Sequence, residues 1–426
     1  MADVGQRATR PVLRTRSPRP SKKSRAVRFG AGIVAGVSDN DPTTVATLAV
    51  IGSTTVYGLA WLSLLIIPML AVVQAVAAQV GAVSKKGLEE CVRVCYGRFW
   101  AFLGLLAVLA VNLLTLAADL EGGGAALQLL THIDYRWWLV PLGGGTVALL
   151  IFGNYHSIER VIRYVALLFL TYVAAAFLAK PDWFAVLRGS LVPHFTFSSD
   201  YVAGALALLG TTLTAYAYVW ETIEMSEERP RLRHIGLVQV DAGLGIVVAG
   251  LTFWFILIAT GATLGVHHHP VQTADDAARA LVPVAGRYAA AIFAVGLLGS
   301  ALVAIPVIAG TSAFVAAEMF HWRSSLDADF EHARAFYLTL GAAVAIATGV
   351  GLLGVPPIKL LFFSGIAGGI ATPFTLVLML LVGRDRKIMR ANRISPVLAA
   401  GGWTVAAIVT VATLIYLWQS LTQGGG

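Results

Sequence analysis

The sequence predicts an all-α polytopic membrane protein. Hydrophobic residues make up 57% of the 426-residue chain and charged residues only 13%, and the mean hydropathy is +0.76. The apolar segments are close to the roughly 20 residues that a helix needs to cross the hydrocarbon core, and no alternating pattern indicates a membrane β-barrel. This composition overrides the several soluble domains that the chain length alone would suggest.

We expect eleven transmembrane helices after a basic N-terminal stretch. Residues 1–27 are rich in Arg, Lys, Pro and Ser and contain no apolar core, which is typical of a disordered cytoplasmic tail and not of a cleaved signal peptide. Residues 28–426 are expected to form one transmembrane domain. Its apolar segments cover approximately 28–52, 59–83, 99–130, 137–153, 161–179, 200–223, 236–264, 281–319, 333–353, 357–383 and 396–418.

Lysine and arginine residues are concentrated in alternate loops. The loops on one side carry most of the 31 basic residues, whereas those on the other side carry only Arg136, Lys180, Arg188, Arg279 and Arg287. Because basic residues stay on the cytoplasmic side, this pattern predicts a multi-pass protein of the cell (inner) membrane with a cytoplasmic N-terminus and an external C-terminus. The net charge of +8 therefore reflects topology, and we expect no nucleic-acid partner.

Two of the apolar segments are interrupted by polar residues at corresponding places. The first contains VSDNDPTTVAT at 37–47, and the sixth contains GTTLTAYAY at 210–218. If segments 1–5 (about 28–180) and 6–10 (about 200–383) form two halves of five helices each, the halves must run through the membrane in opposite directions. This is the inverted-repeat plan of secondary transporters, with broken helices 1 and 6 flanking the binding site, and the segment at 396–418 is an addition.

The interruption in the first segment has the chemistry of a cation site. Pro42 has no N–H group and disfavours helical geometry at Asp41, so the helix should break here and leave carbonyl groups free beside a carboxylate. A hard divalent cation binds an anionic oxygen together with neutral oxygens, which Thr43 and Thr44 can supply. The structural alternative is that Asp41 caps a half-helix.

The sixth segment and three further carboxylates complete the candidate set. The hydroxyls of Thr211 and Thr214 could likewise contribute to a cation site, or they could simply donate hydrogen bonds to backbone carbonyls of their own helix. Asp119 and Glu121 lie deep in the third segment, where each carboxylate costs about 2.5–3.5 kcal/mol on insertion scales. We therefore expect them to face protein or water in a proton relay or salt bridge, and Glu221 could pass protons or attract cations.

The remaining polar groups indicate no catalytic chemistry. His267, His268 and His269 are adjacent in a loop, and such residues rarely converge on one ion, so we interpret them as surface histidines. Cys91 and Cys95 are expected to be reduced thiols. Since no nucleophile triad and no nucleotide-binding loop is present, we expect a secondary transporter that is not an enzyme and needs no cofactor.

The sequence resembles the natural resistance-associated macrophage protein (NRAMP) family of divalent metal transporters, and especially its prokaryotic NRAMP-related magnesium transporter branch. The resemblance implies a LeuT-type fold of eleven or twelve helices and inward metal transport, commonly with protons. It rests on five motifs in the same order, namely AGVSDNDPTTVAT followed by VYGLAW, AADLEGGGAALQLL, NYHSIERVIRY, GTTLTAYAYVWE and AIPVIAGTSAFVAAEMFHW.

The resemblance also implies a metal site and a departure from the family pattern. The metal-binding motif DPGN reads Asp41-Pro42-Thr43-Thr44 here, so Thr44 stands in place of an asparagine. The motif MPH falls on Thr214-Ala215-Tyr216, the carbonyl of Thr211 would be a further ligand, and a later histidine falls on Glu221. Because a thioether disfavours Mg²⁺, its replacement by Thr214 predicts an oxygen-only, partly hydrated site that accepts Mg²⁺ and Mn²⁺.

Three other functions remain open from the sequence. The nearest is a proton-coupled Mn²⁺ or Fe²⁺ symporter of the same family. A symporter of organic substrates such as amino acids would use the same fold, although the Asp41 carboxylate would repel a substrate carboxylate. A sensor or receptor that has kept the fold is disfavoured, because the chain offers no sizeable soluble output domain.

Overall fold

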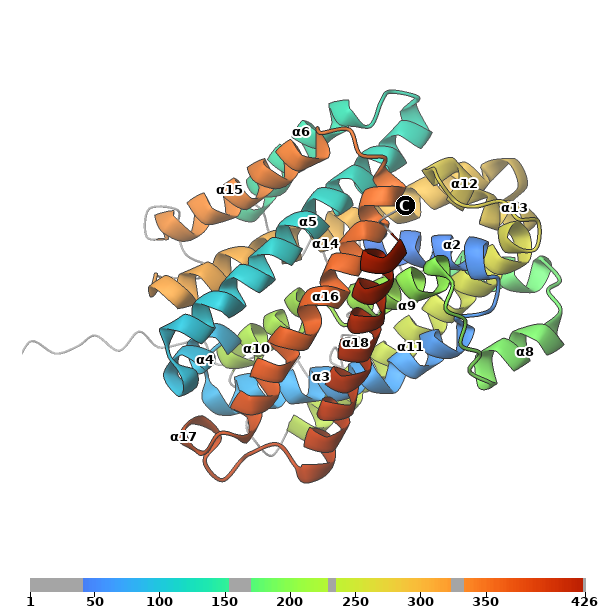
Figure 1. Ribbon diagram of the computed structural model, residues 1–426. Helices are drawn as coiled ribbons and strands as arrows, with labels where there is room; N and C mark the ends of the chain where they lie inside the picture. The colour runs from blue at the N-terminus through green and yellow to red at the C-terminus, as the bar shows by residue number, and fades with distance from the viewer. Residues whose placement is uncertain (1–40, 153–169, 229–234, 323–332, 424–426) are drawn as a thin grey trace, which may run out of the picture.

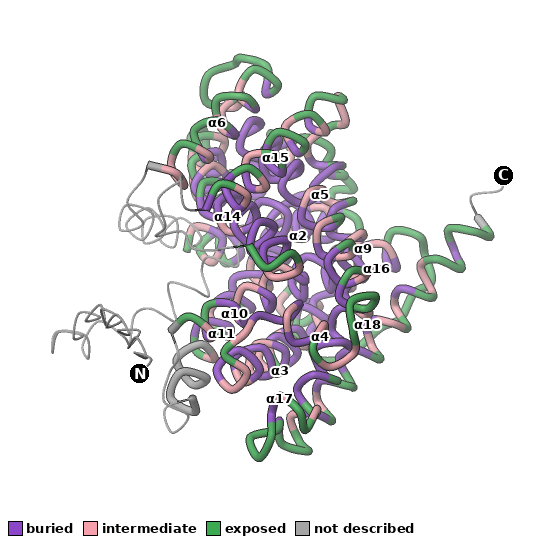
Figure 2. The backbone as a smooth tube through the Cα atoms, turned by 90° about the vertical axis from the view of Figure 1, so that its left-hand side faces the viewer, coloured by how far each residue is buried: buried purple, intermediate pink, exposed green. Residues whose placement is uncertain are grey.

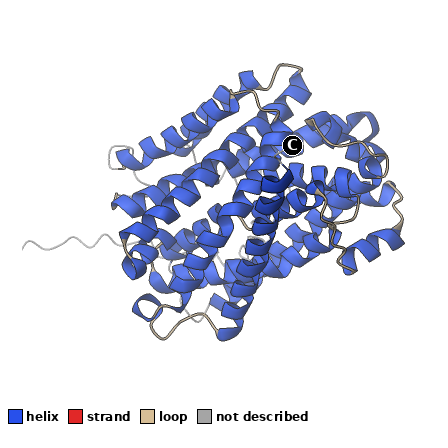
Figure 3. Ribbon diagram, viewed as in Figure 1, coloured by secondary structure: helices blue, strands red, loops and turns tan. Residues whose placement is uncertain are grey.

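All regular elements that the structure describes are helices. The computed structural model describes residues 41–152, 170–228, 235–322 and 333–423, and its long helices pack against one another and cross at several angles (Figures 1 and 3). They are α2 (Pro42–Thr55), α3 (Ala60–Ser84), α4 (Leu88–Tyr96), α5 (Arg98–Thr131), α6 (Arg136–Phe152), α8 (Trp183–Leu191), α9 (Ser199–Thr212), α10 (Ala215–Glu228), α11 (Ile235–Thr260), α12 (Ala274–Ala278), α13 (Val282–Ala285), α14 (Ala289–Phe320), α15 (Arg334–Gly351), α16 (Pro357–Arg384), α17 (Arg386–Met389) and α18 (Pro396–Gln423).

Eight stretches of the described residues are long and apolar enough to cross a membrane, and α6 is a shorter apolar helix. They coincide with the second, third and sixth to eleventh segments expected from the sequence. The all-helical, multi-pass prediction is therefore confirmed. The first and fifth segments lie partly outside the described residues, as does the whole N-terminal stretch 1–27, so the count of eleven stays a prediction.

The buried core lies between the helices, and the outer surface is apolar. α5 packs along α14, α15 and α16, while α18 lies on the outside against α16 and α9 (Figures 1 and 2). On α18, the side chains of Leu414, Trp418 and Leu421 are 60%, 64% and 83% exposed. A surface of this kind suits lipid, because backbone polar groups are satisfied within each helix and the apolar side chains can contact acyl chains.

The sixth segment is broken as expected. α9 ends at Thr212, α10 begins at Ala215, and Leu213 and Thr214 lie between the two helices. In the first segment, α2 begins at Pro42, and Asp41 occupies its N-cap position. Residues before Asp41 lie outside the described part of the chain, so only one side of that break is observed.

Glycines hold α9 tightly against α16. A Cβ atom on Gly210 would overlap the backbone of Gly365 and Gly369, and one on Gly368 would lie 2.8 Å from the carbonyl oxygen of Gly210. Only glycine permits this approach of two helix backbones. Gly368 and Gly369 thus serve helix packing, and the contact lies near the end of α9, where the helix breaks.

The short helix α4, which the sequence pattern does not predict as a separate element, carries both cysteines. They are free thiols, as expected, and lie one turn apart on α4. Burial raises the pKa of the Cys91 thiol to about 12 and that of Cys95 to about 11. Because the thiolate is the reactive form, neither cysteine is set up for redox or metal chemistry.

Glu89, also on α4, is a buried carboxyl group in an unfavourable setting. It is 1% exposed, and its Oε2 atom has no hydrogen-bond partner among the described residues. The Glu318 carboxylate lies against Gly87 at the start of the same helix. Burial, and then the negative charge of Glu318, raise the pKa of Glu89 well above its ordinary value.

Replacing Glu89 with glutamine should stabilise the protein above pH 7. The raised pKa means that the folded state holds the Glu89 proton more tightly than the unfolded state, so stability is lost as the pH rises from the unfolded toward the folded pKa. Glutamine does not ionise and removes that loss, which we expect to be about 1–3 kcal/mol, the usual cost of a buried polar group without a hydrogen-bond partner. Thermal unfolding of the two proteins at pH 5 and pH 8 measures it.

The matched control for this prediction is Glu90→Gln. Glu90 is partly exposed and forms an ion pair with Lys86 at 2.5 Å, so its replacement should bring no gain that grows with pH. An equal gain for Glu89→Gln at both pH values, or the same gain for Glu90→Gln, would contradict our account of Glu89.

Candidate functional site

Asp41 lies where the two broken helices meet. Its Oδ1 atom accepts a hydrogen bond from the backbone N–H of Thr44 at 2.7 Å, and its Oδ2 atom accepts one from the Tyr216 hydroxyl at 2.9 Å. The side chain is 1% exposed. The first hydrogen bond is the capping role that was the structural alternative, and the second directs the carboxylate toward the start of α10. The N-terminus of α2 also favours negative charge at this position.

The predicted threonine ligands join α2 to both sides of the second break. The hydroxyl oxygens of Thr44 and Thr211 lie 3.0 Å apart in a hydrogen bond between α2 and the last turn of α9. Thr214 lies in the break itself, and its buried hydroxyl has no hydrogen-bond partner among the described residues. Since an unpartnered buried hydroxyl is costly, Thr214 offers an oxygen atom that a ligand could use.

A second carboxylate adjoins the first turn of α2. The hydroxyl of Thr43 donates a hydrogen bond to Asp119 Oδ1 on α5 at 2.9 Å and lies 3.4 Å from the Ser364 hydroxyl on α16. The other carboxylate oxygen of Asp119 is buried and has no hydrogen-bond partner in the described part of the chain. The structure therefore brings Asp119 next to the Asp41 site, through a residue that follows Asp41 by two positions.

Two polar residues of the site, Tyr216 and Ser364, were not predicted as metal ligands, whereas Thr43 was expected to supply a neutral oxygen. Tyr216 lies in the second interrupted segment, two residues after Thr214, so its hydroxyl was visible in the sequence. Ser364 gives a weaker signal, as a small polar residue in the apolar stretch FFSGIAGGIATP. What the sequence could not supply is the register of α16 against α2, which decides that Ser364 faces Thr43.

Glu121 and Glu221 lie apart from these contacts. Glu121 is fully buried and faces Gly351 on α15, where a Cβ atom would lie 3.5 Å from its Oε1. Neither of its carboxylate oxygens has a hydrogen-bond partner among the described residues. Glu221 is partly buried on α10, five residues beyond Tyr216 and therefore about 7.5 Å further along the helix axis.

The histidine run lies on the surface. Residues 267–269 are exposed and follow the π-helical turn at the end of α11. No group of three or more His, Cys, Asp or Glu side chains that could hold a metal ion occurs among the described residues. This agrees with the interpretation of these histidines as surface residues, and it leaves an oxygen set with few charges as the candidate site.

Comparison with known proteins places the chain in one family. A model of the natural resistance-associated macrophage protein-like family matches residues 32–419. A curated relative from Deinococcus radiodurans, the divalent metal cation transporter MntH, is 29% identical over 410 residues, which cover 92% of this chain and 90% of the relative.

Two solved structures share the fold. The manganese transporter of Eremococcus coleocola superposes with a TM-score of 0.74 at 19% identity and covers 96% of this chain and 90% of its own. MhsT, solved in complex with L-phenylalanine, superposes with a TM-score of 0.60 at 14% identity, over 95% of this chain and 100% of its own. These likenesses support the predicted LeuT-type architecture, and they concern the fold alone.

The family match covers nearly all of the described helices, including the start of α2, the break between α9 and α10, and Asp41. It therefore includes every residue that the geometry brings to the candidate site. The expectation that the protein is not an enzyme is confirmed, because the matched relatives are transporters. The chain belongs to the natural resistance-associated macrophage protein-like family of membrane transporters.

Proposed function

We propose that this protein is a secondary transporter of divalent metal cations. The observation that carries the proposal is the placement of Asp41 at a helix break, hydrogen-bonded to Tyr216 on one half of the second broken helix. Thr44 pairs with Thr211 on the other half. Asp41 would be the charged ligand, with the hydroxyls of Thr44 and Thr214 and the carbonyl of Thr211 as neutral oxygen ligands, directly or through water.

The relatives favour manganese as the transported ion. The Deinococcus radiodurans relative is named for divalent metal cations and the Eremococcus coleocola protein for manganese. These names support the reading as a proton-coupled Mn²⁺ or Fe²⁺ symporter better than a transporter dedicated to Mg²⁺. Membership of the magnesium branch rests on the oxygen-only ligand set alone, and we propose Mn²⁺ as substrate with Mg²⁺ as an accepted competitor.

Metal binding at this site would compete with its hydrogen bonds. The bonds Tyr216–Asp41 and Thr44–Thr211 tie α2 to both halves of the second broken helix. A cation that takes the carboxylate and hydroxyl oxygens as ligands replaces these bonds by coordination. The site can therefore pass between two closed arrangements without leaving Asp41 unpaired, which suits alternating access between the two sides of the membrane.

We also propose that the neighbouring carboxylates carry the coupled proton. Asp119 is linked through Thr43 to the first turn of α2, so protonation at Asp119 can respond to the charge at Asp41. Glu121, buried without a hydrogen-bond partner among the described residues, and Glu221 on α10 would continue the pathway. The distribution of basic residues supports a cytoplasmic N-terminus, and the family resemblance supports inward transport.

An amino-acid symporter is less well supported. MhsT shares the fold at 14% identity, but half-helix N-termini in such carriers receive a substrate carboxylate. Here the N-terminus of α2 is already occupied by the Asp41 carboxylate. A second negative charge at that place would be repelled.

Transport by the purified protein in proteoliposomes tests the proposal. We expect saturable Mn²⁺ uptake that excess external Mg²⁺ inhibits, since an oxygen-only site discriminates poorly between these ions. An internal pH dye should report acidification during Mn²⁺ uptake if a proton is coupled. Absence of Mn²⁺, Mg²⁺ and Ca²⁺ flux would overturn the proposed function, and Mn²⁺ uptake that is unaffected by Mg²⁺ would overturn the oxygen-only account of its selectivity.

A further inference from the structure

The connection between α16 and α18 carries a concentrated positive charge. All five basic side chains of residues 384–393 are exposed, namely Arg384, Arg386, Lys387, Arg390 and Arg393. The one acidic residue in this stretch, Asp385, caps α17 by accepting a hydrogen bond from the backbone N–H of Lys387 at 2.6 Å. We call the exposed basic side chains of residues 384–393 the α17 surface.

The α17 surface is held in a fixed position. Met389 and Ile394 are 0% and 5% exposed, and the backbone N–H of Ile394 donates to the carbonyl of Gly383 at 3.1 Å. On α3, the Gln79 side chain donates to the carbonyl groups of Asn392 and Arg393 at 3.1 Å and 3.3 Å. Because the backbone is already ordered, little conformational entropy is lost when the cations bind a ligand.

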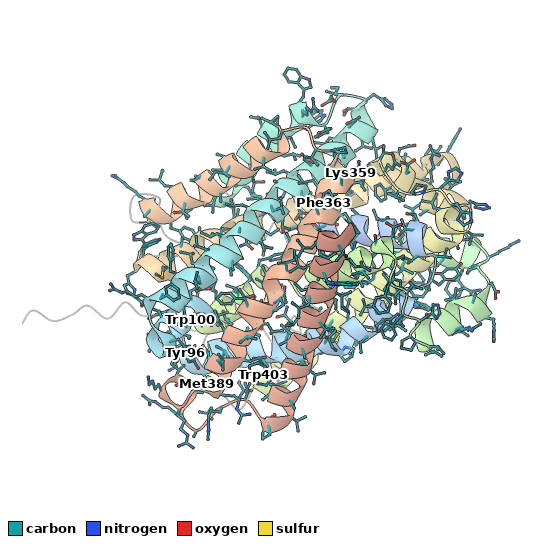
Figure 4. The ribbon with its side chains drawn as sticks, viewed as in Figure 1. Tyr96, Trp100, Lys359, Phe363, Met389 and Trp403 are labelled. Carbon is teal, nitrogen blue, oxygen red and sulfur yellow. The ribbon has the colours of Figure 1, made fainter. Side chains whose placement is uncertain are left out.

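Exposed aromatic side chains lie at the same end of the molecule as the α17 surface. Tyr96, Trp100, Met389 and Trp403 lie at the same end of the molecule (Figure 4). Trp100 and Trp403 are 45% and 39% exposed, and Phe99 is 67% exposed. Exposed tryptophans on transmembrane helices mark the headgroup region, and the cations of the α17 surface lie at the ends of the same helices, on the headgroup side of the apolar stretches.

The other end of the molecule, around α8 and α12 (Figure 1), has no comparable charge. There the basic residues alternate with acidic ones, and Arg279 forms an ion pair with Asp275 at 3.3 Å. Of these two ends, as far as the structure describes them, the one at residues 384–393 carries the excess of positive charge, and Arg98, two residues before Trp100 on α5, is a further exposed cation.

We infer that the α17 surface binds the headgroups of anionic phospholipids. Five cations beside transmembrane helices attract a negatively charged leaflet, and the neighbouring aromatic and apolar side chains offer contacts for acyl chains. A free phosphate ion could pair with the cations but would make no use of the apolar side chains beside them. The ligand that uses both parts is therefore a phospholipid with a net negative charge, such as phosphatidylglycerol.

Thermal unfolding of the purified full-length protein in detergent tests this inference. Added phosphatidylglycerol should raise the melting temperature by several degrees, whereas phosphatidylcholine or inorganic phosphate should not. The variant R386Q/K387Q/R390Q should lose at least half of that rise. The matched control K180Q/R188Q/R287Q removes the same number of exposed cations at the other end and should keep the full rise.

A second measurement keeps the inference testable if the triple variant folds poorly. For the unaltered protein, the rise caused by phosphatidylglycerol should fall by more than half between about 0.05 M and about 0.5 M NaCl, because salt screens exposed charges. An equal rise with phosphatidylcholine, an equal rise with phosphate, a salt-independent rise or a full rise in R386Q/K387Q/R390Q would each overturn it. None of these outcomes depends on metal transport.

Discussion

Replacing Asp41 with asparagine should abolish metal uptake while the protein still folds. Asparagine is as good an N-cap as aspartate, so the start of α2 is kept, and only the negative charge is lost. One ion pair at 4 Å is worth about 4 kcal/mol at an effective dielectric constant of 20, and 1.4 kcal/mol is tenfold in affinity. We expect Mn²⁺ uptake into proteoliposomes to fall by about 100-fold or more.

Two further variants separate charge from structure in this experiment. Asp41→Ala removes the cap as well and should cost about 1 kcal/mol of stability in addition to the loss of uptake. Asp200→Asn alters an exposed carboxylate in the first turn of α9 and should leave uptake unchanged. Undiminished uptake by Asp41→Asn, with melting temperature and expression like those of the unaltered protein, would remove Asp41 from the metal site.

The start of α2 and the break between α9 and α10 could be predicted because they depend on local chemistry. Pro42 cannot donate a hydrogen bond and sets the start of α2, and the sequence GTTLTAY places polar groups where α9 ends and α10 begins. Helices α4, α8 and α17 were not expected as separate elements. They are too short for the periodicity of apolar residues to reveal, and local caps such as Asp182 and Asp385 set where α8 and α17 begin.

The different surroundings of Asp119 and Glu121 could not be predicted from the sequence. Both carboxylates have the same local setting in the third segment, so nothing in the sequence separates their roles. Two residues on a helix point about 200° apart, so Asp119 reaches Thr43 at the site while Glu121 faces α15. Which face turns toward α2 is decided by packing between distant segments, including the glycine contact of α9 and α16.

Replacing Thr214 with methionine should change ion selectivity more than any other single substitution at the site. A thioether binds transition metals and offers little to Mg²⁺, so Mn²⁺ uptake should persist while its inhibition by Mg²⁺ weakens by about tenfold or more, equivalent to about 1.4 kcal/mol. The buried Thr214 hydroxyl, which has no hydrogen-bond partner among the described residues, leaves no broken hydrogen bond behind when it is removed.

Thr214→Leu is the matched control, because leucine and methionine have similar volumes and differ here in the sulfur atom. If the softness of the sulfur ligand governs selectivity, Thr214→Leu should lower Mn²⁺ uptake and leave the inhibition of that uptake by Mg²⁺ unchanged. The same shift in both variants would assign the effect to bulk at the helix break. Unchanged inhibition by Mg²⁺ in Thr214→Met would mean that the Thr214 side chain does not contact the ion, and the ligand set would then reduce to Asp41, Thr44 and Thr211.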